Sequence, residues 1–185
     1  FWGAEKAYWS VPGVVSTADS RTNLILSNPT GLGATATVSV TSADGLTKGT
    51  LTGLYVPPYS RQQIDGVVTA AGLPSLSLGS LTAKVTAGGG RVVPLASVVD
   101  NASNSFSVVK GRRVGSGAFR ALIVPGVVRA TGANDTRYRT SLNIANGTAT
   151  GAITFTGTQD FSVGRTALFT NGWSGYLKID NEIIW

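Results

Sequence analysis

The feature that most constrains the fold is a strict alternation of apolar and hydroxyl-bearing residues between positions 34 and 41. Alanine or valine occupies each even position from Ala34 to Val40, and threonine or serine occupies each odd position from Thr35 to Thr41. Successive side chains of a β-strand point to opposite faces of its sheet. This segment therefore predicts a strand with one buried face and one exposed face.

Turn-forming residues separate several shorter segments with the same alternation. The dipeptides Asn-Pro, Asp-Gly and Asn-Gly and a Gly-Gly-Gly stretch lie between them, and each of these favours a turn. Helical periodicity is weak throughout, and the best helical candidate, residues 61–71, is short and ends at Gly72. Many short strands joined by turns predict an all-β protein, and we expect Ig-like antiparallel β-sandwich domains. The shorter alternating segments are residues 24–26, 142–144 and 153–156.

An internal repeat indicates that two such domains lie in tandem. The motif Val-Pro-Gly-Val-Val begins at Val11 and returns at Val124, an offset of 113 residues (124 minus 11). The segment Arg21–Asn28 matches Arg139–Asn146, with the same Arg-Thr-x-Leu start and the same final asparagine. Each copy then continues into a segment with alternating threonines. Two β-domains of one design are the simplest interpretation.

The two copies differ in how far the similarity extends. Ala83–Val85 parallels Leu177–Ile179, and the first copy then continues with the apolar segment Leu95–Val99. The second copy shows no counterpart of that segment, so we expect its domain to lack one strand. The expected units are an N-terminal extension (residues 1–10), a first sandwich (11–109), a linker (110–117) and a second, incomplete sandwich (118–185).

Three motifs of the first copy resemble a repeat of uncharacterised secreted bacterial surface proteins. They are Val11–Val15 (Val-Pro-x-Val-Val), Arg21–Pro29 (Arg-Thr-x-Leu-x-Leu-x-Asn-Pro) and Val98–Asn101 (Val-Val-Asp-Asn). The second copy follows the pattern as far as Ile144, and Gly147 replaces the proline. The resemblance implies an extracellular array of β-sandwiches, with a pilin-like filament subunit as one form. It brings no catalytic residues and no cofactor.

The composition excludes most enzyme chemistries. The chain has no cysteine and no histidine, so it has no catalytic triad, no thiolate nucleophile and no ordinary zinc site. Asp180 and Glu182 are the only closely spaced carboxylates, and we expect them to serve a turn or an edge strand rather than glycoside hydrolysis. Asp100 with Asn101, and Asp135, are weak candidates for calcium ligands. We expect no enzyme, no metal and no cofactor.

The excess of positive charge lies in the second half of the chain. The net charge is +6, and most of the excess comes from a basic stretch that starts at Lys110 and from Arg129, Arg137 and Arg139. Long neutral runs separate these residues, so a solvated surface is favoured and nucleic acid is not an expected partner. No apolar run reaches the roughly 18 residues that span a bilayer, so we expect no membrane span.

Aromatic and aliphatic residues gather at the two ends of the sequence. Exposed, they would leave apolar surface in water, so each end is expected to be buried. One explanation is that both ends fold back onto their own domains. The other is that the N-terminal segment of one subunit pairs with the open edge of its neighbour's second domain. The expected interface residues are Phe1, Trp2, Ala4, Tyr8, Trp9, Glu182, Ile183, Ile184 and Trp185.

These observations favour a structural protein that assembles with copies of itself. Strand donation gives main-chain hydrogen bonds between different surfaces, so it builds a head-to-tail homopolymer. Because the chain begins with Phe1, we expect a mature secreted protein at the cell surface whose signal peptide has been removed. The alternative is an adhesive or carbohydrate-binding module that binds surface glycans, with Trp173 and Tyr176 as the candidate aromatic platform.

Overall fold

The computed structural model describes residues 8–114 and, in the second half, residues 129–131, 133–135, 137–139, 141–145, 151–155, 165–169 and 176–180. Every strand pair within these residues is antiparallel. Helix in the described residues is limited to α1 (Val67–Ala70) and one 3-10 turn, η1 (Ala133–Asp135). The prediction of an all-β protein is confirmed.

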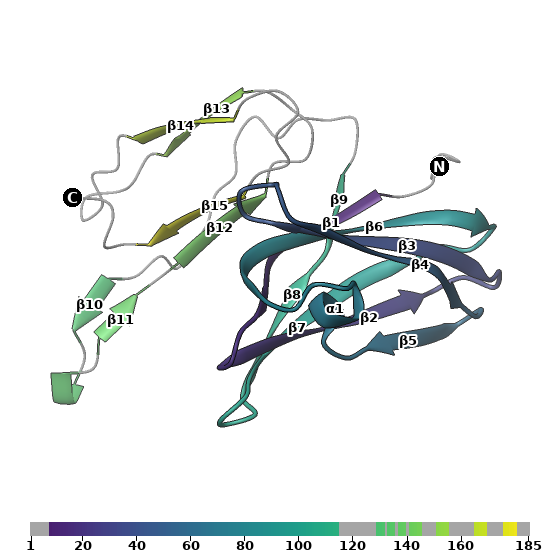
Figure 1. Cartoon of the computed structure of the whole chain (residues 1–185), viewed down its shortest axis with the longest axis horizontal. Helices are drawn as coiled ribbons and strands as arrows, with labels where there is room; N and C mark the ends of the chain where they lie inside the picture. The colour runs from purple at the N-terminus through teal and green to yellow at the C-terminus, as the bar shows by residue number, and fades with distance from the viewer. Residues whose placement is uncertain are drawn as a thin grey trace.

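Nine strands of the first half form one continuous sheet. Their hydrogen-bonded order is β4-β3-β6-β1-β2-β7-β8, with β5 added to β2 and β9 added to β1 (Figure 1). The strands are β1 (Tyr8–Ser16), β2 (Ser20–Asn28), β3 (Ala34–Ser42), β4 (Lys48–Val56), β5 (Ser60–Ile64), β6 (Leu76–Gly88), β7 (Val93–Asp100), β8 (Phe106–Lys110) and β9 (Arg112–Val114).

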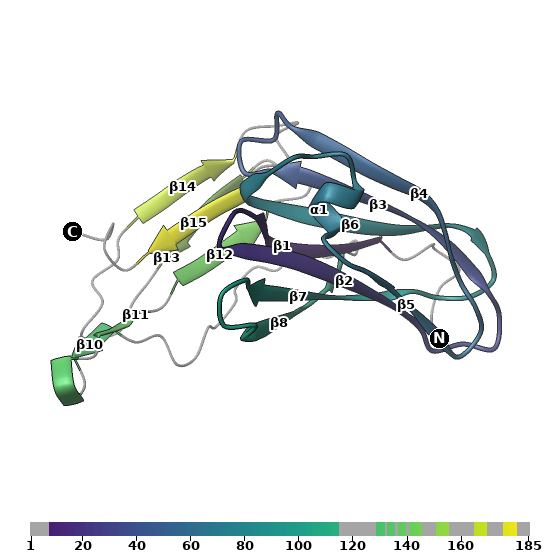
Figure 2. The ribbon, with the colours of Figure 1, turned by 60° about the horizontal axis from the view of Figure 1, so that its bottom comes forward.

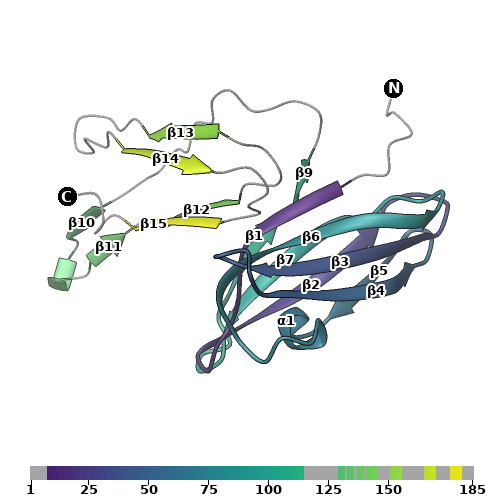
Figure 3. The ribbon, with the colours of Figure 1, turned by 45° about the horizontal axis from the view of Figure 1, so that its top comes forward.

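The sheet folds over into two layers at the junction of β1 and β2. A single residue pair, Ser16 with Arg21, joins these two strands. One layer holds β4, β3, β6, β1 and β9, and the other holds β5, β2, β7 and β8. Figure 2 shows the two layers, and Figure 3 shows β9 beside β1. The first half of the chain is therefore a β-sandwich.

The core lies between the two layers and follows the alternation seen in the sequence. The four apolar side chains of β3 from Ala34 to Val40 are fully buried. Leu24 and Leu26 on β2 belong to the same buried cluster in the opposite layer, and α1 adds two buried valines. Burial of one aliphatic side chain stabilises a fold by about 1.5–3 kcal/mol. The predicted half-buried strand at residues 34–41 is confirmed.

The Val-Pro-Gly-Val-Val motif bends β1 toward the second layer. The pairing of β1 with β6 is irregular between Pro12 and Val14, and Gly13 between them has φ 81°, in the region that favours glycine. After the bend, the hydroxyl of Thr22 donates to the carbonyl oxygen of Val15 at 2.8 Å and accepts from its N–H at 2.9 Å. The first copy of the motif thus gives β1 an irregular pairing with β6 just before the turn into β2.

Three boundaries differ from those expected from the sequence. β1 begins at Tyr8, inside the expected extension of residues 1–10, and β8 and β9 cover most of residues 106–114, where a linker was expected from residue 110. The helix expected at residues 61–71 is wrong over its first part, because residues 60–64 form β5 along β2. Tertiary pairing overrides the weak local helical preference there.

The second half contains three separate strand pairs within the described residues. They include strands at two of the segments where the sequence predicts them, near residues 142–144 and 153–156. No helix in the described part of the chain is long and apolar enough to cross a membrane. The pairs are β10 (Arg129–Thr131) with β11 (Arg137–Arg139), β12 (Ser141–Ala145) with β15 (Tyr176–Asp180), and β13 (Gly151–Phe155) with β14 (Arg165–Phe169).

Candidate assembly edges and an aromatic loop cluster

Two of the nine expected interface residues lie in the described structure, and both belong to β1. Tyr8 is opposite Lys84 of β6 and Val114 of β9, so the start of β1 has a strand on each side. Trp9 is half-buried and packs against the core. These two residues are therefore held in their own sandwich and are not part of a free extension. The other seven lie outside the described residues: Phe1, Trp2, Ala4, Glu182, Ile183, Ile184 and Trp185.

The indole of Trp9 is held in the sandwich with no polar partner in the part of the chain that the structure describes. Its Nε1 is buried and has no hydrogen-bond partner among the described residues. A buried donor without an acceptor carries a free-energy cost of about 1–3 kcal/mol. The contacts of the ring with the core offset this cost, as do the hydrogen bonds that β1 makes with β6 and β9.

The strand β8 forms one edge of the second layer. Among the described strands it pairs only with β7. Phe106 is 69% exposed and Val108 is 58% exposed, so this edge presents apolar side chains to solvent. Edge strands of that kind are sites where another strand can add. The edge strand β4, in contrast, is interrupted by Gly53 at φ 68°, beside an irregularity in its pairing with β3.

The pairing of β12 with β15 repeats the pairing of β2 with β5. Leu24 is opposite Ile64 in the first half, and Leu142 is opposite Ile179 in the second half. The alignment of Ala83–Val85 with Leu177–Ile179 is therefore not supported. The first of these segments lies in β6, which pairs with β1 and β3 and not with β2. A similarity over three residues is too short to decide whether Leu177–Ile179 corresponds to a segment of β6 or of β5.

The loop between β2 and β3 is held by Asn28, which is 2% exposed. Its Nδ2 donates to the carbonyl oxygens of Leu32 (2.7 Å), Val56 (3.2 Å) and Pro57 (3.0 Å). Its Oδ1 accepts from the N–H and the hydroxyl of Thr30 at 3.1 and 2.7 Å. One buried amide thereby ties the β2–β3 loop to the turn between β4 and β5.

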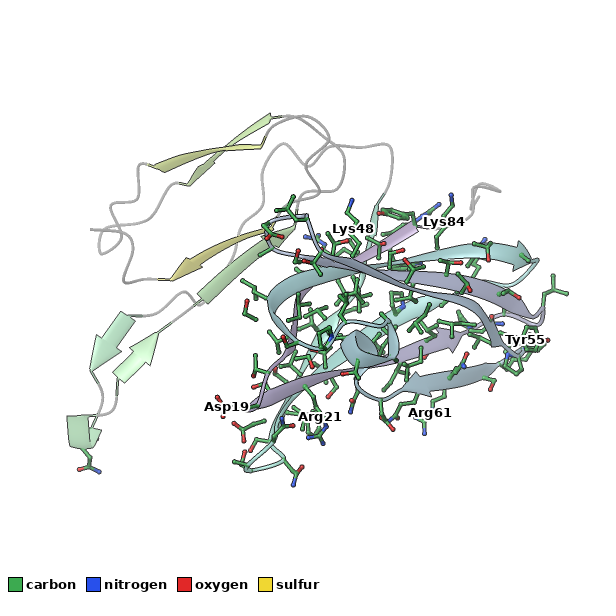
Figure 4. The ribbon with its side chains drawn as sticks, viewed as in Figure 1. Asp19, Arg21, Lys48, Tyr55, Arg61 and Lys84 are labelled. Carbon is green, nitrogen blue, oxygen red and sulfur yellow. The ribbon has the colours of Figure 1, made fainter. Side chains whose placement is uncertain are left out.

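Two exposed tyrosines lie over this loop and form what we call the aromatic loop cluster, Tyr55 and Tyr59. They are 57% and 79% exposed, and Tyr59 has φ 49°, which is uncommon outside glycine and asparagine. A side chain at Gly31 would come within 3.1 Å of the Tyr59 hydroxyl, so the glycine leaves room for the ring. Figure 4 shows Tyr55 at one end of the sandwich, with Asp19 at the other.

Sequence reasoning did not identify the aromatic loop cluster. The Asn28-Pro29 dipeptide predicts the turn between β2 and β3. The Gly-x-Gly sequence of residues 31–33 was the signal that a large side chain could pack against the backbone of this turn. The carbohydrate platform expected from the sequence lies elsewhere. Trp173 is outside the described residues, and Tyr176 begins β15 opposite Ala145.

The basic residues of the second half are only partly brought together. Arg112 and Arg113 are exposed on β9. The β10–β11 pair places Arg129 opposite Arg139, and Arg137 opposite Thr131. Like charges in opposite positions of two strands disfavour pairing. This arrangement joins three basic residues on one short ladder and involves none of the basic residues of the first half.

Two carboxylates in the described residues, Asp44 and Asp100, hold turns through local hydrogen bonds. Asp100 accepts hydrogen bonds from the N–H and hydroxyl of Ser103 and from the N–H of Ala102, and these bonds lower its pKa. The hydroxyl of Ser42 similarly lowers the pKa of Asp44. No group of acidic residues within the described part of the chain has the spacing of a metal site.

The remaining acidic candidates from the sequence do not form a site in the described structure. Asp135 belongs to η1, and Asp180 ends β15. Glu182, the expected neighbour of Asp180, lies outside the described residues. The side chain of Asn101 is engaged locally: its Oδ1 accepts from Arg21 at 2.6 Å and its Nδ2 donates to the carbonyl oxygen of Ala18 at 2.9 Å.

Comparison with known proteins gives a distant structural similarity and no family. No family model matches the sequence. No curated protein matches it either. A solved structure that is similar is the crystal structure of Thermotoga maritima 1070, with a TM-score of 0.43 and 14% sequence identity. The match covers 60% of this chain and 94% of that one.

Proposed function

We propose that this protein is a structural subunit of an extracellular filament or surface layer. Its two repeats form tandem Ig-like sandwiches, and the N-terminal segment of one subunit adds as a strand to the second sandwich of the next. The protein acts as a secreted, non-enzymatic building block. Its partner is a second copy of the same chain.

The observation that carries this proposal is the pairing of β2 and of its counterpart β12. In the first sandwich β2 has β5 along one edge and β7 along the other. In the described residues of the second half, β12 has β15 in the register of β5. An edge strand whose other side is open to pairing is the usual acceptor in strand addition.

The composition of the N-terminal segment supports its role as the added strand. The seven residues before β1 include Phe1, Trp2 and Ala4. Extended, they reach about 23 Å from the start of β1.

Deleting residues Phe1–Lys6 tests the proposal. We expect the whole chain to form filaments or large assemblies visible by electron microscopy, and the deleted chain to remain monomeric in analytical ultracentrifugation. The deleted chain should still fold, because the described sandwich begins at Tyr8. Circular dichroism checks this. The control for the deletion is a chain in which the same six residues are replaced by a Gly-Ser sequence of equal length. Assemblies that survive both changes would contradict the proposal.

The aromatic loop cluster favours a second function, adhesion to surface glycans. Exposed aromatic rings offer flat apolar faces with a polar hydroxyl at one end, and the Asn28 hydrogen bonds hold the loop beneath them in one arrangement. If the cluster binds sugars, Tyr59→Ala and Tyr55→Ala should each weaken glycan binding about tenfold or more, measured on a glycan array and by titration calorimetry. Phe106→Ala, an exposed aromatic on β8, is the matched control. Equal binding by all three variants would exclude this function.

A further inference from the structure

Two glycines besides Gly31 leave room for large exposed side chains at the end of the sandwich that carries the aromatic loop cluster. A Cβ atom at Gly33 would lie 2.5 Å from the hydroxyl oxygen of Tyr55, and a Cβ atom at Gly89 would lie 2.8 Å from Cδ1 of Leu32. Leu32 is 61% exposed, so it extends the apolar surface of the two tyrosines. Each of these side chains therefore rests on the backbone of a loop and keeps its outer side open to solvent.

The backbone itself does not require glycine at residues 31 and 33. Neither Gly31 nor Gly33 has a positive φ, so an alanine could adopt either conformation. The space that the tyrosine rings occupy is what excludes a larger residue there. The two glycines thus position the rings, and a ring supported by backbone on one side offers its other side to a ligand.

Thr30 brings a basic residue to the aromatic loop cluster. Its carbonyl oxygen accepts from the N–H of Tyr59 at 3.1 Å, and its hydroxyl accepts from the N–H of Arg91 at 3.2 Å. Arg61 follows Tyr59 by two residues on β5, and both arginines are exposed. Figure 4 shows Arg61 on β5 and Tyr55 at the end of the sandwich. Two arginines therefore border the apolar surface.

Negative charge within residues 8–114 is kept away from this end. The three loops that meet here, residues 29–33, 57–59 and 89–92, contain no aspartate and no glutamate. Each carboxylate within residues 8–114 ends or follows a strand that runs away from the aromatic loop cluster. These carboxylates are Asp19, Asp44, Asp65 and Asp100. The loops at this end therefore favour an anionic ligand.

We propose that this end of the sandwich binds an acidic polysaccharide. Its sugar rings lie on the apolar surface of Leu32, Tyr55 and Tyr59, and its carboxylate or sulfate groups pair with Arg61 and Arg91. This proposal rests on the second candidate function, adhesion to glycans, and names the class of glycan. A guanidinium group suits these anions because it can form two parallel hydrogen bonds to their oxygen atoms.

Two further properties of the loops favour this ligand. The hydrogen bonds of Asn28 hold the loops in one arrangement before binding, which lowers the entropic cost of association. A nucleic acid is matched less well, because its affinity comes mainly from many phosphate contacts and only two arginines border the rings. An oligonucleotide is therefore the competing ligand that the experiment must include.

Titration calorimetry of the whole chain with polygalacturonate, dextran sulfate and neutral dextran tests the class of ligand. We expect the two acidic polymers to bind at least about tenfold more tightly than dextran, because charged hydrogen bonds add to the stacking of the rings. Their affinity should fall when salt is raised from about 0.1 M to about 1 M, because the charges are then screened.

Replacing Arg61 by glutamine should weaken the binding of both acidic polymers about tenfold. Arg61 is exposed, so the fold does not depend on its charge. The matched control is Lys48→Gln, which removes the same charge from an exposed position at the other end of β4. The control should bind the acidic polymers as tightly as the unmodified chain does.

Gly33→Ala separates the positioned ring from the attraction of charge. The added methyl group displaces the Tyr55 ring and changes neither the charge nor the number of aromatic residues. We expect the affinity for polygalacturonate to fall about fivefold while the urea midpoint stays nearly unchanged, because the displaced atoms are the exposed end of a side chain. Gly31→Ala should have a smaller effect, because its added carbon would lie 3.1 Å from the Tyr59 hydroxyl.

The remaining outcomes separate this proposal from the candidate function on which it rests. Binding confined to neutral glycans would overturn the acidic ligand and leave adhesion to glycans standing, whereas binding to no glycan at all would overturn both. Equal losses for Arg61→Gln and Lys48→Gln would show a diffuse attraction and overturn the site. A single-stranded oligonucleotide that binds more tightly than polygalacturonate would overturn the polysaccharide as the ligand.

Discussion

Replacing Asn28 by alanine is expected to lower the free energy of unfolding of the first sandwich by about 3 kcal/mol, roughly a hundredfold in the folding equilibrium. The amide is 2% exposed and donates to three carbonyl oxygens from two separate loops. Alanine removes the amide hydrogen bonds to these oxygens and to the N–H of Thr30. The loss follows because burying an unpaired polar group costs more than a made hydrogen bond contributes.

Urea denaturation followed by circular dichroism measures this loss. The control is Ser27→Ala, the preceding position on the same strand, which is half-buried and points to the other face of β2. It should change the stability by no more than about 0.5 kcal/mol. Equal stability of the two variants would show that the Asn28 hydrogen bonds do not hold the loops together.

Replacing Leu24 by alanine should cost about 3–4 kcal/mol. Leu24 is fully buried and lies on β2 opposite both Ile64 and Ala96, so its side chain is enclosed where three strands meet. Truncation removes apolar burial and leaves a cavity that a strand paired on both edges cannot collapse to fill.

The matched control for this change is Leu46→Ala. Leu46 is 82% exposed in the turn between β3 and β4, so the same truncation there should be nearly neutral. A loss below about 1 kcal/mol for Leu24→Ala, in the same urea titration, would contradict the central position of β2 in the core. The comparison separates burial from the chemistry of the substitution.

Local patterns predicted the class of the fold and several of its strands. The alternation of residues 34–41 predicts β3 and its buried face because the two-residue period of a strand is visible in any single segment. The Val-Pro-Gly motif marks the bend of β1 because Gly13 adopts a positive φ. The apolar segment at residues 95–99 was expected to be a strand, and it lies in β7.

Other elements could not be predicted because their cause lies in distant residues. Residues 60–64 lack a strand pattern and become β5 through pairing with β2. Lys110 to Val114 read as a polar linker and become the end of β8 and all of β9, because they complete ladders with β7 and β1. The aromatic loop cluster depends on Asn28, which joins loops that are far apart in the sequence.

The sequence by itself determined that the chain is all-β and that histidine and cysteine chemistry is absent. Only the tertiary structure decided which strands are neighbours. The residue pattern of a strand shows which of its faces is buried, but it does not show which other strand lies beside it. The tertiary structure placed Tyr8 and Trp9 inside their own sandwich. It also showed that β12 pairs with β15 in the register in which β2 pairs with β5.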